Sequence, residues 1–158
     1  MKLEGKIALV TGGSQGLGRA IALKLAENGA DIAIAYVGPE EPALATAKEI
    51  EALGRRVKLY VCDVRDEAAC NETVAAVSKD LGKVDILVNN AGVTRDGLMV
   101  SMKDEDYNML LDINLKGAFH MTRACYRDFM RRRSGKIINI SSIAGLVGNA
   151  GQVNYAAS

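Results

Sequence analysis

The sequence has few residues of the kinds that build disulfide scaffolds and metal centres. It contains three cysteines, Cys62, Cys70 and Cys125, and one histidine, His120, among 158 residues. The cysteines are too few and too irregularly spaced for a disulfide framework or a paired-cysteine metal site, so we expect them to be reduced and structural. A serine–histidine hydrolase would have to use His120, which lies inside a predicted helix, where we expect a surface or packing role. No metal site is predicted.

Long apolar runs and a strong charge of either sign are also missing. No run approaches the roughly 20 apolar residues that cross a bilayer. The first six residues include an acid and no long apolar stretch, unlike a secretory signal. The formal net charge is +1, and the basic residues are spread along the chain apart from the run at 131–133. We therefore expect a cytoplasmic location and neither a membrane nor a nucleic-acid partner.

What the sequence does contain is a regular alternation of short apolar runs and helical patterns. Its length suits one domain with a substantial core. Because several apolar runs are continuous rather than alternating, they favour strands that are buried on both faces of a parallel sheet. We predict one α/β domain over residues 1–158, a Rossmann-type doubly wound parallel sheet truncated after the fifth strand. The predicted strands are 7–10, 31–36, 57–62, 84–88 and 136–140, and the helices are 16–28, one after Pro42, one around 70–81, and 104–131.

A glycine-rich turn, with Gly12, Gly16 and Gly18, follows the first predicted strand. In a doubly wound sheet this turn directs main-chain N–H groups and a helix N-terminus at a pyrophosphate, and larger side chains would block its approach. The spacing GxxxGxG differs from the GxGxxG fingerprint. A turn that merely connects strand and helix is the alternative. A phosphate loop of the ATPase kind is disfavoured, because Arg19 and Ala20 stand where lysine and serine or threonine are required.

Five motifs in register resemble the short-chain dehydrogenase/reductase family, and the resemblance covers the whole chain. The segments 93–99 and 148–155 are most similar to bacterial 3-oxoacyl-[acyl-carrier-protein] reductases. The motifs are TGGSQGLG at 11–18, Asp63-Val64 after the third strand, Asn89-Asn90-Ala91-Gly92 after the fourth, Asn114 in the long helix, and Ser142 followed thirteen residues later by Tyr155.

The resemblance implies a nicotinamide dinucleotide site. Asp63 would accept a hydrogen bond from the exocyclic amine of adenine, and the amide of Val64 would complete the edge contact. The alternative role for Asp63 is a cap of the helix that begins near residue 66. The implied cofactor residues are Gly12, Ser14, Gln15, Gly16, Leu17, Gly18, Tyr36, Val37, Asp63, Val64, Asn90, Ala91, Gly92 and Tyr155.

The end of the second strand bears on the choice between NADP and NAD. An acid there would bind the 2′-hydroxyl of NAD, whereas this sequence has Tyr36-Val37-Gly38. Many related NADP enzymes carry basic residues where Gln15 and Val37 stand. We predict NADP, with NAD as the alternative.

The resemblance also implies the catalytic residues Asn114, Ser142 and Tyr155. Ketone reduction leaves negative charge on the former carbonyl oxygen, so Tyr155 would protonate it and Ser142 would bind the substrate through that oxygen. A tyrosine of ordinary pKa, about 10, needs a nearby cation for this task. In the family the cation is a lysine four residues after the tyrosine.

Asn114 stands out from the helical pattern of the sequence even when the family resemblance is set aside. It falls on the helical stripe of Tyr107, Leu111, Ala118 and Cys125, where the pattern calls for an apolar group. An unpaired buried amide costs about 1–3 kcal/mol, so the side chain needs a partner. The resemblance supplies an ordered water in a proton relay. The alternative is a helix kink satisfied by the local main chain.

The implied function is NADPH-dependent reduction of 3-oxoacyl thioesters, carried by acyl carrier protein or CoA, in fatty acid synthesis. The alternatives are a sugar or polyol dehydrogenase on the same scaffold and a non-catalytic nucleotide-binding module. The resemblance also implies a homotetramer that pairs the 104–131 helices through an apolar outer stripe. Arg95 and Arg133 would dock the acidic carrier protein. For the basic run at 131–133, a favourable interaction with the helix dipole is the alternative explanation.

The final residues, 155–158, have the pattern of a helix start. Domain boundaries usually fall in exposed, flexible segments. We therefore expect the 158 residues to be a fragment that is inactive alone. A lysine, two further strands and the substrate-covering helices would follow Ser158. The fifth strand would then be an exposed apolar edge.

Overall fold

The computed structural model describes residues 1–158 and contains a five-stranded sheet in the order β3-β2-β1-β4-β5. Every neighbouring pair is parallel, so the predicted doubly wound architecture is confirmed. Each strand differs from its predicted range by no more than about two residues at an end, as is usual for strand boundaries. The strands are β1 (Ile7–Thr11), β2 (Asp31–Tyr36), β3 (Val57–Val61), β4 (Ile86–Asn89) and β5 (Lys136–Asn139).

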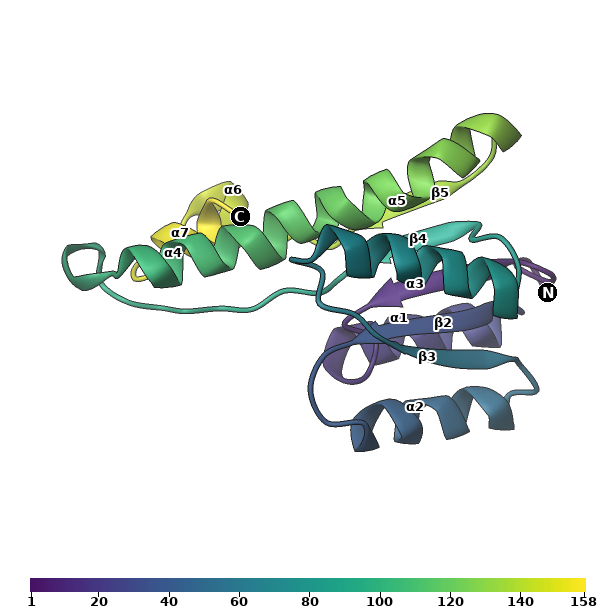
Figure 1. The fold of residues 1–158 in the computed structure, drawn as a ribbon. Helices are drawn as coiled ribbons and strands as arrows, with labels where there is room; N and C mark the ends of the chain where they lie inside the picture. The colour runs from purple at the N-terminus through teal and green to yellow at the C-terminus, as the bar shows by residue number, and fades with distance from the viewer.

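Helices cover both faces of this sheet, as Figure 1 shows. On one face, α1 (Gly16–Glu27) and α2 (Glu41–Ala52) pack on side chains such as Ile32 and Ile34. On the other face, α3 (Glu67–Asp80) and α5 (Gly117–Arg132) pack on Leu9 and Leu87. Successive residues of a strand point to opposite faces, so two covered faces require the continuous apolar strands seen in the sequence.

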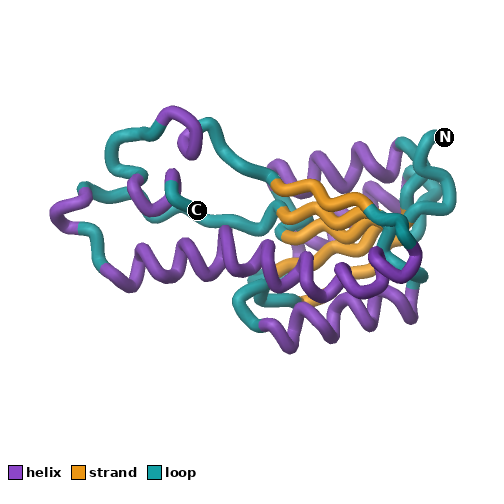
Figure 2. The backbone as a smooth tube through the Cα atoms, turned by 90° about the horizontal axis from the view of Figure 1, so that it is seen from above, coloured by secondary structure: helices purple, strands orange, loops and turns teal.

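The predicted helix over 104–131 is interrupted. It consists of α4 (Asp104–Leu111), a π-helical segment (Asp112–Lys116) and α5, which follow one another as a single rod that extends beyond the sheet (Figure 2). A π-helical turn changes the phase of the stripe, because it holds more residues than an α-turn. The expected stripe is therefore wrong at its start: Leu110 is buried there, while Tyr107 is exposed.

The carboxyl-terminal part of the chain is much less covered than the sheet. β5 pairs only with β4, and all four of its residues are exposed, so the predicted apolar edge is confirmed. Two short helices follow, α6 (Ala144–Val147) and α7 (Val153–Ala156). Both lie beside α4 and the segment after β4 rather than over the sheet (Figures 1 and 2). None of the helices has both the length and the apolar character needed to cross a membrane.

Candidate functional site

The turn between β1 and α1 depends on its glycines for two different reasons. Gly12 and Gly16 have positive φ angles of 62° and 56°, which favour glycine. Gly18 has an ordinary backbone but no room for a side chain. A Cβ there would overlap the carbonyl oxygen of Gly12 and lie 2.5 Å from Nδ2 of Asn90. The last glycine therefore allows α1 to approach the turn and the end of β4.

Side chains from β1 and from the end of β4 hold this turn in place. Asn90 Nδ2 donates to the carbonyls of Thr11 at 3.0 Å and Gly12 at 3.2 Å. The hydroxyl of Thr11 accepts from the main-chain N–H groups of Asn90 and Ala91, both at 3.0 Å, and donates to Val88 O at 3.3 Å. Thr11 was not among the predicted site residues. Its signal was a hydroxyl at the end of an otherwise apolar strand.

A second threonine, Thr46, was also missed. It is fully buried on α2, and its hydroxyl lies 2.9 Å from the carbonyl of Ser14. This bond joins the turn to a helix on the same face of the sheet. Thr46 also donates within its own helix to Pro42 O at 3.1 Å, a local bond that the sequence alone does not distinguish from a role in the turn.

A cavity of about 530 Å³ lies beside the turn. Of the predicted cofactor residues, Gly16 and Tyr155 do not line it, since Gly16 only shapes the turn and Tyr155 lines a neighbouring cavity. The remaining lining residues, including Arg65, were not predicted. The predicted residues that line it are Gly12, Ser14, Gln15, Leu17, Gly18, Tyr36, Val37, Asp63, Val64, Asn90, Ala91 and Gly92.

At the far side of this cavity Asp63 is paired with Arg65. The Arg65 guanidinium lies 2.6 Å from Oδ2 of Asp63, and its hydrogen bonds hold the pKa of Asp63 below the ordinary range. The alternative role of Asp63 as a helix cap is wrong. Asp66 caps α3 instead, by accepting from the main-chain N–H groups of Ala68 and Ala69.

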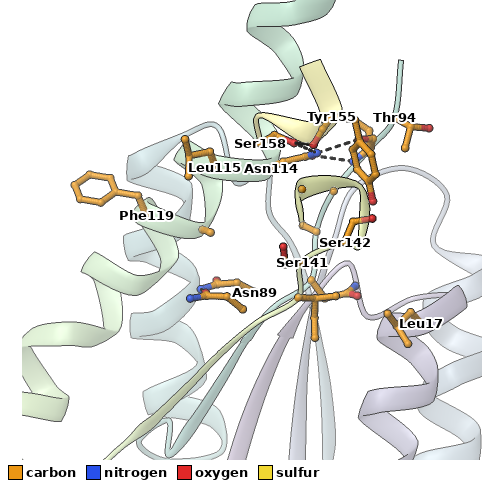
Figure 3. Close-up of a pocket in the computed structure, with 18 of the residues that line it drawn as sticks. Leu17, Asn89, Thr94, Asn114, Leu115, Phe119, Ser141, Ser142, Tyr155 and Ser158 are labelled. Atoms are coloured by element: carbon orange, nitrogen blue, oxygen red, sulfur yellow. Dashed lines mark hydrogen bonds between the residues drawn. The ribbon is translucent and has the colours of Figure 1, made fainter. Parts of the chain in front are cut away.

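A second cavity, of about 940 Å³, brings together the three predicted catalytic residues, Asn114, Ser142 and Tyr155 (Figure 3). They come from the π-helical segment, the loop after β5, and α7. The two cavities meet along a common set of lining residues, so the glycine turn and the catalytic residues face connected space. The shared residues are Leu17, Asn90, Ala91, Gly92 and Val93.

Asn114 is held by the main chain of Val93. Its Oδ1 accepts from Val93 N at 2.9 Å, and its Nδ2 donates to Val93 O at 3.0 Å and to Ser158 Oγ at 3.0 Å. Its partners are therefore distant in sequence, although the helix is distorted at this residue as the alternative explanation required. This pairing fixes the segment that follows Gly92 against the long rod.

Ser142 and Tyr155 are both half-buried in the wall of the second cavity. In Figure 3 the phenol ring of Tyr155 is directed toward Ser142. The Ser142 hydroxyl oxygen accepts from Ala144 N at 3.2 Å, which leaves its proton free to donate. Ser141 lines the same cavity.

A buried amide positions α7. Asn154 is fully buried, donates to Arg95 O at 2.9 Å, and accepts from Tyr155 N at 2.8 Å. Nearby, Gln152 Nε2 donates to Asp96 Oδ2 at 3.0 Å. These bonds tie the helix that carries Tyr155 to the loop after β4. The sequence analysis missed Asn154 because nothing local marks it as buried.

The two arginines predicted to dock a carrier protein lie beyond opposite ends of two neighbouring strands, β4 and β5. Arg95 is on the exposed loop that follows β4, whereas Arg133 follows α5 and precedes β5 (Figure 1). Its neighbour Arg132 pairs with Asp85, just before β4 begins, and with Asp128. The structure therefore does not bring Arg95 and Arg133 together within one chain.

The remaining predictions concern His120, the three cysteines and metal binding. His120 is buried, with Nδ1 2.9 Å from Val64 O, which agrees with a packing role. The three cysteines are buried and unpaired. No three side chains of histidine, cysteine, aspartate or glutamate gather where they could hold a metal ion.

Comparison with known proteins places these motifs in a family. The 3-oxoacyl-[acyl-carrier-protein] reductases FabG of Thermotoga maritima and Escherichia coli (strain K12) are 42% and 45% identical over 158 residues, all of this chain. The chain spans 64% and 63% of those proteins. An NAD⁺-bound xylitol dehydrogenase superposes with a TM-score of 0.95 at 35% identity, over 99% of this chain and 60% of that one. Since the short chain dehydrogenase family model matches residues 6–158, the chain belongs to this family.

Proposed function

We propose that the full-length protein reduces 3-oxoacyl thioesters to 3-hydroxyacyl thioesters with NADPH. The observation that carries the proposal is that Asn114, Ser142 and Tyr155 line one cavity, which joins the cavity at the glycine turn. The reductases named above supply the substrate class, because they are 42–45% identical to this chain. The residues fit a dinucleotide, since the glycine turn and the N-terminus of α1 line the first cavity, where a pyrophosphate can be bound.

Each residue has a separate task in this proposal. A nicotinamide cofactor held at the first cavity would supply the hydride. Tyr155 donates its phenolic proton to the developing alkoxide, and Ser142 donates a hydrogen bond to the same oxygen. Both amide protons of Asn114 are used by Val93 O and Ser158 Oγ, so an ordered water that reprotonates Tyr155 would donate to the second lone pair of Asn114 Oδ1. A lysine one helical turn beyond Tyr155, at the position after Ser158, would favour the phenolate by its charge.

The preference for NADPH rests on the end of β2. Tyr36 and Val37 line the first cavity without a carboxylate that would repel a 2′-phosphate. Asp63 is the only acid in the lining, and Arg65 neutralises it. A measured preference for NADH of more than about tenfold, equal to about 1.4 kcal/mol, would overturn this part of the proposal.

Carrier docking is proposed for Arg95. It lies on the loop next to Thr94, which lines the catalytic cavity, whereas Arg133 precedes β5 and so lies at the opposite end of that strand from the cavity. Arg133 can contribute only from another subunit or to a distant part of a carrier. Arg95→Glu should raise KM for a carrier-bound substrate and spare a short CoA thioester. Equal effects on both substrates would refute docking at this residue.

We propose self-association through the exposed face of the long rod. Leu115, Phe119, Tyr126 and Met130 recur on this face and are each more than half exposed. Apolar side chains at this spacing form the kind of stripe that pairs with a second helix. Light scattering on the full-length protein should give a multimer, whereas a monodisperse monomer would refute the pairing. A cytoplasmic location remains part of the proposal.

The deciding experiment offers the full-length protein NADPH with acetoacetyl-CoA, and NAD⁺ or NADP⁺ with xylitol. Turnover of the thioester supports the proposal. Turnover of the polyol alone would favour the dehydrogenase alternative, which the similarity to xylitol dehydrogenase keeps under consideration. Binding without turnover would favour a nucleotide-binding module. Tyr155→Phe should lower kcat by about 10³-fold with little change in cofactor binding, because only the transferred proton is lost.

A further inference from the structure

The only histidine lies close to the proposed adenine site but is not part of the proposed chemistry. His120 is 5% exposed, on the face of α5 that covers the sheet. Its Nδ1 lies 2.9 Å from the carbonyl oxygen of Val64, in the turn between β3 and α3. A carbonyl can only accept, so Nδ1 carries the proton and donates it. The bond joins α5 to a residue that lines the first cavity.

Val64 is held on more than one side. Its carbonyl also accepts from the thiol of Cys70 on α3, at 3.6 Å. Its side chain packs over Gly117, one turn before His120 on α5, where an added Cβ would lie 2.5 Å from Cγ2 of Val64. Only 6% of Val64 is exposed. Two helices therefore fix this residue through its carbonyl and its side chain.

The N–H group of the same residue is left free. Neither Val64 N nor the adjacent Asp63 N makes a hydrogen bond within the chain, whereas the N–H groups of Cys62, Arg65 and Asp66 on either side are bonded. A nearly buried N–H without a partner is costly unless a ligand or water completes it. The side chain of Asp63 lies beside it, also in the cavity wall; Arg65 donates to both of its oxygens, and their remaining lone pairs can still accept. A donor next to an acceptor matches the edge of adenine, which has an acceptor at N1 and a donor at the exocyclic amine.

We propose that His120 is a positioning residue for the adenine end of the cofactor: by bonding the Val64 carbonyl it holds the Val64 N–H and Asp63 in register with the base edge. This inference rests on the proposed nicotinamide cofactor but does not depend on the substrate. The long rod then has a role at both ends of the site, through Asn114 in its π-helical segment and through His120 in α5.

The test compares NADPH with its hypoxanthine analogue, in which the base edge is inverted: N1 becomes a donor and the amine becomes a carbonyl. Dissociation constants are measured with the full-length protein by fluorescence of the reduced nicotinamide. His120→Phe keeps a ring but removes the donor. We expect it to raise Kd for NADPH about tenfold, in line with the loss of one buried hydrogen bond. Kd for the analogue should change less than about twofold, since its edge does not use this pairing.

Two further variants separate positioning from stability. His120→Asn places an amide N–H near the position of Nδ1, so it should restore Kd for NADPH to within about threefold of wild type. Met121→Leu alters the adjacent fully buried residue, which makes no polar bond, and should leave the preference for adenine over hypoxanthine unchanged. If His120→Phe does not fold, His120→Gln replaces it. The longer amide of glutamine reaches toward the position of Nε2, so this variant should raise Kd for NADPH about as much as His120→Phe.

Several outcomes overturn the inference. Equal weakening of both cofactors in the Phe and Gln variants would show that His120 only stabilises the fold. An unchanged Kd for NADPH in these variants would show that Val64 is held in place without the bond from His120. Failure of the wild-type protein to bind any adenine dinucleotide would remove this inference together with the proposed function. Binding of NADPH without turnover of a 3-oxoacyl thioester would remove the proposed substrate, while the base preference would still decide the role of His120.

Discussion

β2 and β5 are both short and rich in isoleucine, yet their surroundings are opposite. All six residues of β2 are buried between β1 and β3, whereas all four residues of β5 are exposed at an edge. The candidate site is divided in the same way. Its cofactor half rests on buried strands and main-chain bonds, while its catalytic half lies beyond β5 on short helices that a few amide side chains hold (Figure 2). The two halves are therefore held by different bonds, main-chain bonds in the cofactor half and a few amide side chains in the catalytic half.

The largest effect should come from filling the cofactor half. In Gly18→Ala the new Cβ meets the Gly12 carbonyl and the Asn90 amide, neither of which can move without breaking the bonds that hold the turn. We expect the cofactor Kd to rise about 100-fold or more, because close approach of main chain to the pyrophosphate is lost. Isothermal titration of the full-length protein measures this.

Gly16→Ala is the matched control for this variant. Gly16 has a positive φ of 56° but nothing within 4 Å of a Cβ, so alanine there costs only backbone strain, about 1–2 kcal/mol. The loss of affinity should be clearly smaller than for Gly18. If the two variants weaken cofactor binding equally, backbone strain and not close packing determines which residues the turn accepts. The tightly packed cofactor half would then not differ from the catalytic half in the way described.

In the catalytic half, Asn154→Ala should have the next largest effect. It removes the donor to Arg95 O and the acceptor for Tyr155 N in a fully buried position, so unfolding should become easier by about 2 kcal/mol. We expect kcat to fall about tenfold because Tyr155 is less well placed. Cofactor Kd should stay within about twofold of wild type, since no bond of the cofactor half is lost. A parallel loss of cofactor affinity would contradict the division into halves.

A third prediction concerns how low pH affects the stability that Asp31 contributes at the start of β2. Burial opposes ionisation of Asp31, but hydrogen bonds from the main chain and guanidinium of Arg56, and the charge of Arg55, outweigh it and lower the pKa of Asp31. A carboxyl group whose pKa is lowered in the folded state contributes its full stabilisation of the fold at pH values above its unfolded pKa of about 3.9. This contribution is lost as the pH falls through the folded pKa.

Asp31→Asn should therefore cost about 1–2 kcal/mol in free energy of unfolding at pH 7, because Arg55 and Arg56 lose their shared partner. The difference from wild type should shrink below pH 4 in urea titrations. Glu27→Gln, in an exposed pair with Lys24, should change stability at pH 7 by less than about 0.5 kcal/mol. A constant difference between Asp31→Asn and wild type across this pH range would show that shape and not charge matters at residue 31.

The sequence predicted the buried half more completely than the exposed half. The positions of all five strands along the chain, and their parallel sheet, followed from apolar runs, since a strand covered on both faces leaves a continuous pattern. Helical spacing placed α1, α2 and α3. A helix kink at Asn114 was predicted only as an alternative, with partners in the local main chain. The π-helical segment lies at this residue, but Asn114 bonds Val93, and no local pattern in the sequence encodes that bond.

Site residues divide in a similar way. Gly12, Ser142 and Tyr155 were found because motif spacing marks them, and the fold brings them to connected cavities. Thr11, Asn154 and Arg65 were missed because their roles depend on partners distant in space or on a competing neighbour. Asp63 illustrates the limit: an acid before a helix predicts a cap, yet Asp66 takes that position and Arg65 takes the carboxylate of Asp63.

The smallest expected effect is that of Gln152→Ala, and it tests how loosely the catalytic half is held. Gln152 bonds Asp96 at 3.0 Å and accepts from Asn149 at 2.9 Å, but both bonds are exposed to water, which can replace them. The free energy of unfolding should change by less than about 0.5 kcal/mol, as for other exposed polar contacts. The loop after β4 should nevertheless become more mobile, since Asn154 and the main-chain bond from Gly97 to Gly151 then hold it. Faster amide exchange confined to residues 94–99 and 149–152, with KM for the thioester raised about twofold, is the expected result. Exchange that also quickens in the glycine turn at 12–18 would show that the two halves are mechanically coupled, contrary to the comparison drawn from β2 and β5.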